Sequence, residues 1–273
     1  MRGIEATEAI IFFRTKIAST KNVSSRRDSF GAMTIQQRIS MPSFSSILQP
    51  LHDFLFVTEC LHCGVRLNND EQRVCSNCWN ALSKVHEHDY TFKVLMDRFR
   101  EGGVIDDFVT LFYFEKGKLL QTLAHSLKYD EGTTFGFELG VRLGKKISSS
   151  TIDCIIPVPL NKRKERERGY NQSDWIAKGL ASVINVPVLS NAVRRTRYTV
   201  TQTHLNAEER KKNIADAFEV TDTDAICGKN ILLVDDIITT GSTIQEIAQV
   251  LKKAKAKRIT AGSAGLAKLG EDA

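Results

Sequence analysis

The sequence predicts an α/β protein with a mainly parallel sheet flanked by helices, preceded by a small cysteine-rich unit. Strand-like and helix-like segments alternate between residues 107 and 264, which is typical of a parallel sheet covered by helices. Two C-x2-C motifs lie close together within residues 60–78. A chain of 273 residues with 42% hydrophobic content has room for one sizeable core and such a satellite unit.

Composition favours anionic partners and excludes a membrane-spanning protein. The formal net charge is +6 and 26% of the residues are charged, which favours phosphates or nucleic acid without choosing between them. The longest apolar runs, residues 9–13 and 54–57, are too short to cross a bilayer. We therefore expect a cytoplasmic protein without a membrane partner.

The first forty residues stand apart in composition. Residues 9–52 hold one acidic residue, Asp28, against six Lys or Arg, and show no apolar periodicity. Such a segment predicts a disordered leader or an organellar targeting peptide. We favour a start codon assigned too early, with Met33 or Met41 as the working start. The expected organisation is then a leader over 1–40, a cysteine unit over 41–85 and an α/β domain over 105–268.

The cysteine unit has the spacing of a metal site. Cys60 and Cys63 form one C-x2-C pair, Cys75 and Cys78 the other, and eleven residues separate the pairs. Two such pairs supply the four thiolates that tetrahedral zinc prefers, although the pattern does not separate zinc from iron. Disulfides or unrelated thiols are the alternatives, and disulfides fit poorly with a chain that lacks a secretory signal. Because four protein ligands leave no open position, we expect a structural metal, with His62 as an unneeded rival ligand.

Each element of the α/β domain follows from its local pattern. Strands rich in β-branched, aromatic or other apolar residues are predicted over 107–114, 152–160 (interrupted by Pro157 and Pro159), 231–234 and 258–264. Helices with apolar residues at helical spacing are predicted over 118–129, 137–147, 172–184 and 243–253. The remaining charged stretch, residues 194–212, has no predicted regular structure.

The candidate ligand site follows the strand over 231–234. Asp235 and Asp236 come next, then Ile237 and the stretch ITTGST over 238–243, in which Gly241 permits a tight turn and the hydroxyls can donate to an anion. Ligands of parallel sheets bind where such loops lead into helix N-termini. A phosphate monoester fits this loop, and the two acids would hold sugar hydroxyls or Mg2+. The pattern predicts a site for a phosphorylated sugar, with a plain solvated strand exit as the alternative.

Six sequence features together resemble the ComF/GntX family of type I phosphoribosyltransferases. ILLVDDIITTGST at 231–243 resembles the signature that binds phosphoribosyl pyrophosphate (PRPP). The other features are the four-cysteine unit, HSLKY at 125–129, IPVPL at 156–160, RERGYNQ at 166–172 and TQTHLNAEERKKNIADAF at 201–218. The resemblance covers about residues 41–268 and departs at Val200-Thr201, where the family commonly has two prolines.

The resemblance implies a type I phosphoribosyltransferase-like fold and a Mg-PRPP site. Asp235 and Asp236 would be the catalytic residues that bind the ribose hydroxyls, next to Ile237. Thr239, Thr240, Gly241, Ser242 and Thr243 would hold the 5-phosphate. Val158, Pro159 and Leu160 would face pyrophosphate, and the segment Arg195–Arg210 would be a mobile hood.

Arginines of the basic run over 162–168 are candidate cations for the leaving pyrophosphate. They are Arg163, Arg166 and Arg168, and a solvated helix turn is the alternative interpretation of the run. The implied activity is transfer of phosphoribosyl to an unidentified acceptor with release of pyrophosphate, with structural Zn2+ and with Mg2+ bound to PRPP. The alternative is a protein without catalytic activity that senses PRPP or serves as a scaffold in competence and DNA uptake. It would act through the competence machinery or single-stranded DNA (ssDNA).

Overall fold

The computed structural model describes residues 58–115, 118–127, 132–147, 152–196 and 217–268. The predicted leader, most of the predicted hood and Val200-Thr201 therefore lie outside the described residues, as does nearly all of the 201–218 motif. The predicted domain bounds stay predictions. Within the described ranges, no helix is long and apolar enough to cross a membrane.

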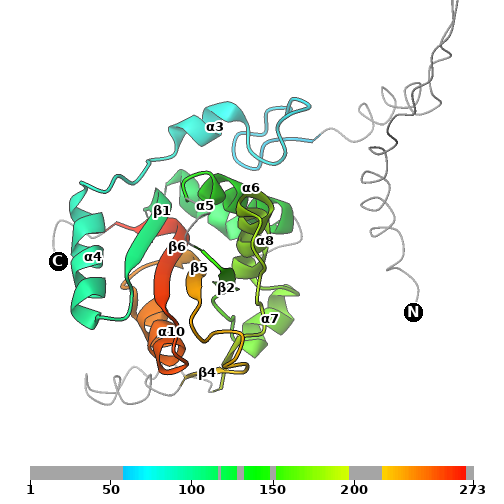
Figure 1. Cartoon of the computed structure of the whole chain (residues 1–273). Helices are drawn as coiled ribbons and strands as arrows, with labels where there is room; N and C mark the ends of the chain where they lie inside the picture. The colour runs from blue at the N-terminus through cyan, green and yellow to red at the C-terminus, as the bar shows by residue number, and fades with distance from the viewer. Residues whose placement is uncertain (1–57, 116–117, 128–131, 148–151, 197–216, 269–273) are drawn as a thin grey trace, which may run out of the picture. The chain divides into compact units, whose positions relative to one another are not determined.

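Helices and strands alternate through the α/β part of the chain (Figure 1). The helices are α3 (Ser76–Ala81), α4 (Tyr90–Gly102), α5 (Leu119–Ser126), α6 (Gly132–Gly144), α7 (Lys162–Arg168), α8 (Gln172–Ile184) and α10 (Ser242–Lys253). The strands are β1 (Asp107–Phe114), β2 (Cys154–Pro157), β3 (Val193–Arg195), β4 (Phe218–Val220), β5 (Asn230–Ile238) and β6 (Arg258–Ala267).

The central sheet is parallel, as predicted. Its strand order is β1-β6-β5-β2, and each neighbouring pair runs in the same direction (Figure 1). In this register Asp235 lies opposite Ser263 of β6, and Pro157 at the end of β2 lies opposite Val234. The carboxyl ends of β2 and β5 therefore lie side by side at the same end of the sheet, where parallel sheets bind ligands.

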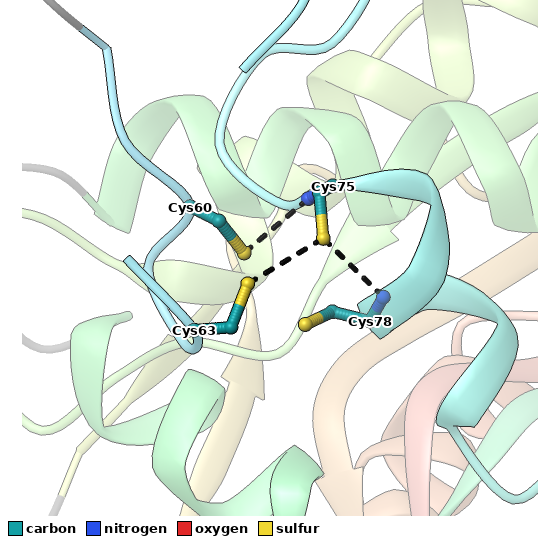
Figure 2. A group of neighbouring side chains, drawn as sticks. All are labelled: Cys60, Cys63, Cys75 and Cys78. Carbon is teal, nitrogen blue, oxygen red and sulfur yellow. Dashed lines mark hydrogen bonds between the residues drawn. The ribbon is translucent and has the colours of Figure 1, made fainter. Parts of the chain in front are cut away.

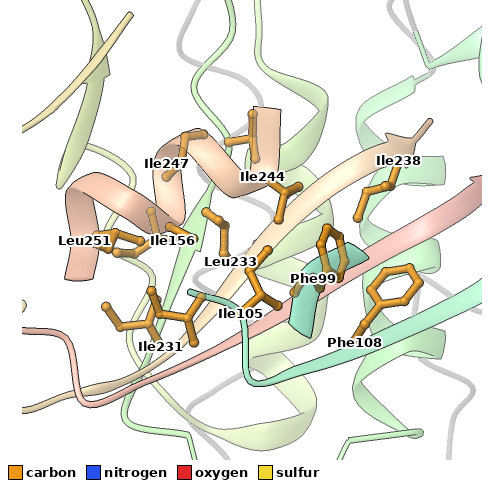
Figure 3. Close-up of a cluster of buried hydrophobic side chains, with 14 of the residues drawn as sticks. Phe99, Ile105, Phe108, Ile156, Ile231, Leu233, Ile238, Ile244, Ile247 and Leu251 are labelled. Carbon is orange, nitrogen blue, oxygen red and sulfur yellow. The ribbon is translucent and has the colours of Figure 1, made fainter. Parts of the chain in front are cut away.

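Each face of the sheet is covered by a separate hydrophobic cluster. Along β5 the side chains alternate: Ile231 and Leu233 join one cluster, whereas Leu232 and Val234 join the other. The first cluster contains the apolar faces of α4 and α10, and Figure 3 shows Ile244 packing toward the strands. The second contains those of α5, α6 and α8. Burial on both faces explains the unbroken apolar run of β5.

Short extended segments cover both edges of the sheet. Beside β1, the Tyr113 N–H donates to the Ser83 carbonyl oxygen at 2.8 Å. Beside β2, the Leu189 N–H donates to the Ile155 carbonyl oxygen at 2.8 Å. Pairing of this kind leaves little free strand edge for another chain to join.

Some predicted elements needed correction. The strand predicted over 152–160 ends at Pro157, because Pro157 and Pro159 lack the N–H that a ladder requires. The helix predicted to start at Phe137 begins at Gly132; its glycines have low helix propensity, which hid its first turn. Helix α4 and the short antiparallel pair β3-β4 were not predicted. By contrast, β1 and α8 have the predicted bounds.

Glycines let α6 and α8 approach each other closely. A Cβ atom on Gly140 would lie 2.0 Å from the carbonyl oxygen of Ile176, and one on Gly179 would lie 2.0 Å from that of Phe137. Backbone atoms therefore occupy the space that side chains fill in most helix pairs. This contact fixes α8, whose N-terminal end reaches the edge of the sheet where β2 and β5 end.

Replacing Gly140 with alanine is expected to lower the free energy of unfolding by about 2 kcal/mol, because the new Cβ would overlap a backbone atom that cannot move away. Gly136→Ala on the same helix is the control, since the atom nearest to its new Cβ would be the Trp175 Cβ, at 3.1 Å. Chemical denaturation of both variants measures the difference. Equal destabilisation by the two substitutions would contradict the close helix contact.

Candidate functional site

The two acids lie inside strand β5 and not after it, which corrects the sequence prediction. β5 runs to Ile238, so both acids lie within the strand, and Asp235 pairs with Ser263 of β6. The loop that follows leads into α10, whose N-cap residue Gly241 has a φ of 78°. Such a left-handed backbone favours glycine. A Cβ there would also lie 2.6 Å from Cε1 of Phe99 in α4. Both the backbone conformation and the lack of space therefore require glycine at this position.

A cleft forms where β5 passes into α10. It encloses about 230 Å³, part of it open to solvent. Its lining includes most of the predicted sugar-phosphate residues: Asp235, Ile237, Thr239, Thr240, Gly241, Ser242 and Thr243. Ile238 and Ile244, which were not predicted, complete the lining. Asp236 is not part of the lining; its carboxylate accepts a hydrogen bond from the Ile237 N–H at 2.7 Å. Of the residues predicted to hold the ribose and the 5-phosphate, the cleft thus brings together all but Asp236.

The loop in this cleft offers several hydrogen-bond donors to an anion. Thr239, Thr240, Ser242 and Thr243 are exposed, and the Thr240 and Ser242 hydroxyls lie 2.9 Å apart. The N–H groups of the first turn of α10 have no partner within the helix, and the helix dipole is positive at this end. This combination is suited to a phosphate group.

Asp235 is a partly buried carboxylate with two donors. Its Oδ1 accepts from the Ser173 hydroxyl at 3.0 Å and from the Asp236 N–H at 2.9 Å. Burial and the charge of Asp236 raise the pKa of Asp235 well above its usual range, and the two hydrogen bonds act against this rise. The carboxylate is held in one orientation at the wall of the cleft.

The loop after β2 lies next to Asp235. The Val158 N–H donates to the Val234 carbonyl oxygen at 2.8 Å, so Val158, Pro159 and Leu160 leave the sheet beside the residue that precedes Asp235. Val158 is buried, and its two successors are half-buried. The predicted pyrophosphate-facing loop and the acids are therefore neighbours.

The basic run over 162–168 forms α7, with no buried residue. Arg163 pairs through Nε with Oε1 of Glu167 at 2.9 Å, and both side chains are exposed. Arg163, Arg166 and Arg168 are not among the residues that line the cleft. The run is thus an exposed helix, and a role of its arginines toward pyrophosphate stays a prediction.

Sequence reasoning missed one cation beside the loop over residues 239–243, which is called the phosphate loop below because a phosphate is predicted to bind there. Nη1 of Arg98 in α4 donates to the Thr240 carbonyl oxygen at 3.0 Å. Nε2 of Gln245 in α10 donates to the Arg98 carbonyl oxygen at 3.0 Å, which fastens the two helices together. The apolar spacing of residues 92–99 could have predicted α4, but nothing in the sequence places Arg98 beside a loop that is 142 residues away.

The four cysteines of the N-terminal unit lie together, as predicted (Figure 2). All four sulfur atoms lie within 4.8 Å of one another, and His62 is not in the group. A tetrahedral zinc ion with bonds of about 2.3 Å places its sulfurs about 3.8 Å apart. The Sγ atoms of Cys63 and Cys75 are 3.7 Å apart, so the cluster fits such an ion.

Backbone N–H groups point at the cysteine sulfurs. The Cys75 N–H donates to Sγ of Cys60 at 3.3 Å, and Gly64 has the positive φ, 69°, that lets the first turn close. Burial by itself raises the pKa of Cys60, but three backbone N–H groups outweigh it and lower that pKa to about 6. The N–H groups that point at Cys60 therefore favour its thiolate, which is the form that binds a metal.

Trp79 docks the cysteine unit on the α/β domain. This residue of α3 is buried between Phe112 of β1 and Phe135 of α6, with ring centroids 5.9 and 5.8 Å away. Its Nε1 donates to Oε1 of Glu138 at 3.0 Å, and the Arg142 guanidinium lies 3.7 Å from the ring centroid. Cys60, Cys75 and Cys78 belong to the same hydrophobic cluster as these rings.

Solved structures of phosphoribosyltransferases resemble the chain weakly. Glutamine PRPP amidotransferase of B. subtilis is 20% identical, with a TM-score of 0.36 over 49% of this chain and 27% of that one. An adenine phosphoribosyltransferase is 18% identical, with a TM-score of 0.33 over 50% of this chain and 69% of that one. Likenesses at this level carry no conclusion about the site.

Sequence comparisons identify the family. The phosphoribosyl transferase domain model matches residues 175–268. DNA utilization protein YhgH of Escherichia coli K12 is 43% identical over 99 residues, 36% of this chain and 43% of that protein. Competence protein ComFC of Bacillus subtilis is 29% identical over 219 residues, 74% of this chain and 81% of that protein. Competence protein F of Haemophilus influenzae is 32% identical over 202 residues, 71% of this chain and 78% of that protein. The chain therefore belongs to the ComF family, with a type I phosphoribosyltransferase fold behind a four-cysteine cluster.

Proposed function

We propose that the protein binds Mg-PRPP in the β5-α10 cleft and transfers its phosphoribosyl group to an acceptor, releasing pyrophosphate. The observation that carries this proposal is the position of Asp235 beside both the hydroxyl-rich loop and the loop Val158–Leu160. A sugar with a phosphate at one end and pyrophosphate at the other needs these three features side by side. The acceptor remains unidentified, and a cytoplasmic location remains a prediction.

The 5-phosphate would bind to the loop Thr239–Thr243. The hydroxyls and the first N–H groups of α10 would donate to its oxygens, and the positive helix end would offset part of its charge. Arg98, which is anchored to the Thr240 carbonyl oxygen, would add a full positive charge. This charge matters because Asp235 and Asp236 lie close by.

The ribose hydroxyls would donate to the carboxylate of Asp235, and Asp236 would supply the second carboxylate near the sugar. As the bond between ribose C1 and the pyrophosphate oxygen breaks, positive charge develops on the sugar ring, and carboxylates nearby favour that charge. The bonding electrons leave with pyrophosphate, and a lone pair of the acceptor forms the new bond to C1. The loop Val158–Leu160 would position the departing group.

Mg2+ would enter with PRPP. The cysteines are the only group of three or more potential metal-binding His, Cys, Asp or Glu side chains in the described part of the chain, so the cleft itself has no prebuilt cage. Mg2+ needs oxygen ligands, which the phosphates of PRPP supply. When bound, it would stabilise the charge of the leaving pyrophosphate.

The second candidate is a role in competence without catalysis, in which the protein senses PRPP or serves as a scaffold. The names of the relatives, competence protein F and DNA utilization protein, favour it. The exposed basic helix α7 also suits contacts with ssDNA or protein partners. In this case PRPP binding and ssDNA binding would be separable.

The cysteine cluster would hold a structural Zn2+. Four thiolates at tetrahedral spacing leave no position for a substrate, so the ion would fasten the two turns on which the Cys60–Cys63 and Cys75–Cys78 pairs lie. These turns carry Trp79 to its place on the α/β domain. Metal binding would then stabilise the docked arrangement.

The double variant Asp235→Asn, Asp236→Asn is expected to bind Mg-PRPP about a hundredfold more weakly, because neutral amides replace two charged acceptors. Calorimetric titration measures this loss, and Asp224→Asn, at an exposed acid outside the cleft, is the control. Lack of binding by the folded wild-type protein would reject the transferase proposal. Salt-dependent ssDNA binding that is kept in the double variant would support the second candidate.

Arg98→Gln is expected to weaken the binding of Mg-PRPP and of ribose 5-phosphate about tenfold each, since both ligands carry the 5-phosphate. Arg100→Gln is a matched control on the same helix, because the exposed Arg100 side chain pairs with Asp97 at 3.4 Å. The same titration compares the two variants. If Arg98→Gln binds both ligands as tightly as Arg100→Gln does, the charge of Arg98 does not contribute to phosphate binding.

Metal analysis of the purified protein is expected to give about one zinc ion per chain. Cys63→Ser should lower both the metal content and the melting temperature, whereas Cys227→Ser, at an exposed cysteine outside the cluster, should change neither. In a Trp175→Phe background, leaving Trp79 as the only tryptophan, chelation should change the fluorescence of Trp79. Iron in place of zinc, or an unchanged melting temperature after chelation, would refute the structural zinc.

A further inference from the structure

A run of buried polar residues marks the start of α8. Among the described residues, the buried polar or charged side chains are Thr91, Thr110, Asn171, Gln172, Ser173, Thr260 and Ser263. Three of these are consecutive, with exposed fractions of 7%, 2% and 3% for Asn171, Gln172 and Ser173. Burying polar groups is costly unless each one has a partner, so such a run needs a reason. It also lies outside the phosphoribosyl transferase match, which begins at residue 175.

The first contact of the run fixes its position. Nε2 of Gln172 donates to the Leu127 carbonyl oxygen at 3.0 Å, and the hydroxyl of Tyr170 donates to the same oxygen at 2.7 Å. Leu127 follows the last residue of α5. The start of α8 is therefore anchored to another element from both sides of Asn171.

Asn171 joins α8 to the loop after β2. Its Oδ1 accepts from the Ser173 N–H at 3.2 Å, which is the ordinary contact of an N-cap residue. Its Nδ2 donates to the Val158 carbonyl oxygen at 2.9 Å, a contact that capping does not need. This second bond ties the first residue of the pyrophosphate-facing loop to α8.

Ser173 makes the corresponding bond to the acid. Its hydroxyl donates to Oδ1 of Asp235 at 3.0 Å, although a serine at this helix position could have faced its own backbone. Asn171 and Ser173 therefore reach in parallel to the loop after β2 and to the acid in β5. The Val158 N–H already donates to the Val234 carbonyl oxygen, so these bonds close a small network around the ends of two strands.

We propose that Asn171 and Ser173 are positioning residues, which hold the loop Val158–Leu160 and the carboxylate of Asp235 in one fixed arrangement. This inference rests on the proposed PRPP site. The bond that breaks joins the ribose, next to Asp235, to pyrophosphate, next to the loop. An error of alignment between these two sides would be costly for such a reaction. Two adjacent side chains on one rigid helix suit that task.

The roles of Asn171 and Ser173 can be distinguished by comparing two ligands. Mg-PRPP needs both the acid and the loop, whereas ribose 5-phosphate has no pyrophosphate and needs only the acid. Ser173→Ala is therefore expected to lower the affinity for both ligands by a similar factor, about tenfold. Asn171→Ser keeps a capping oxygen, but the serine side chain is too short to reach the Val158 carbonyl oxygen. This variant should therefore bind Mg-PRPP about tenfold more weakly and bind ribose 5-phosphate like the wild type.

Two further variants control for folding. Ser182→Ala, on the same helix, also removes a serine hydroxyl bond, from Oγ to the Gly179 carbonyl oxygen at 2.7 Å, and should bind both ligands like the wild type. Ser173→Thr keeps the hydroxyl and should restore affinity. Titration calorimetry with each ligand and a thermal melt of each variant make the comparison.

The outcomes are distinct. Wild-type affinities in Ser173→Ala and Asn171→Ser would overturn the positioning role and leave the PRPP site intact. Losses that follow the melting temperature and affect both ligands equally in every variant would also overturn it. A ligand-specific loss in Asn171→Ser, together with unchanged affinities in Ser182→Ala, would establish it. A folded wild-type protein that binds neither ligand would overturn this inference and the proposed function together.

Discussion

Burial of β5 on both faces is the constraint on which the rest of the structure depends. Its apolar residues supply one hydrophobic cluster on each side of the sheet, so the strand cannot shift by one residue without exchanging the two sets. The strand changes from fully buried residues to half-buried acids between Val234 and Asp235. The register that buries Val234 is thus the register that places Asp235 at the cleft.

Elements with a strong local signal could be predicted from sequence. The amphipathic spacing of α8, the aromatic β1 strand and the two acids before ITTGST all follow from near neighbours in the chain. The bond of Arg98 to the phosphate loop and that of Ser173 to Asp235 join residues that are 142 and 62 positions apart. Such contacts depend on the packing of helices and strands, which the pattern of one segment does not reveal.

The cysteine unit has little core of its own. Its buried apolar side chains include Val74, Trp79 and Leu82, and they belong to the cluster that α6 and α8 form with the sheet. A unit of this size is stable only with a metal or a supporting surface. The α/β domain supplies the surface, and the four cysteines could hold a metal ion. Trp79 is central because its ring fills the cluster while its indole N–H reaches Glu138. The conformation of the cysteine turns and the packing on α6 are thereby linked.

The phosphate loop is shaped by a helix that the phosphoribosyl transferase match does not include. Gly241 turns the backbone through a left-handed conformation, and Phe99 and Leu95 of α4 occupy the space where a side chain would be. Arg98 of the same helix fastens the Thr240 carbonyl oxygen. Because this oxygen is engaged, it is kept from facing an anionic ligand, and the neighbouring N–H groups are left to do so. Helix α4, at residues 90–102, is thus as much a part of the candidate site as the loop in residues 175–268.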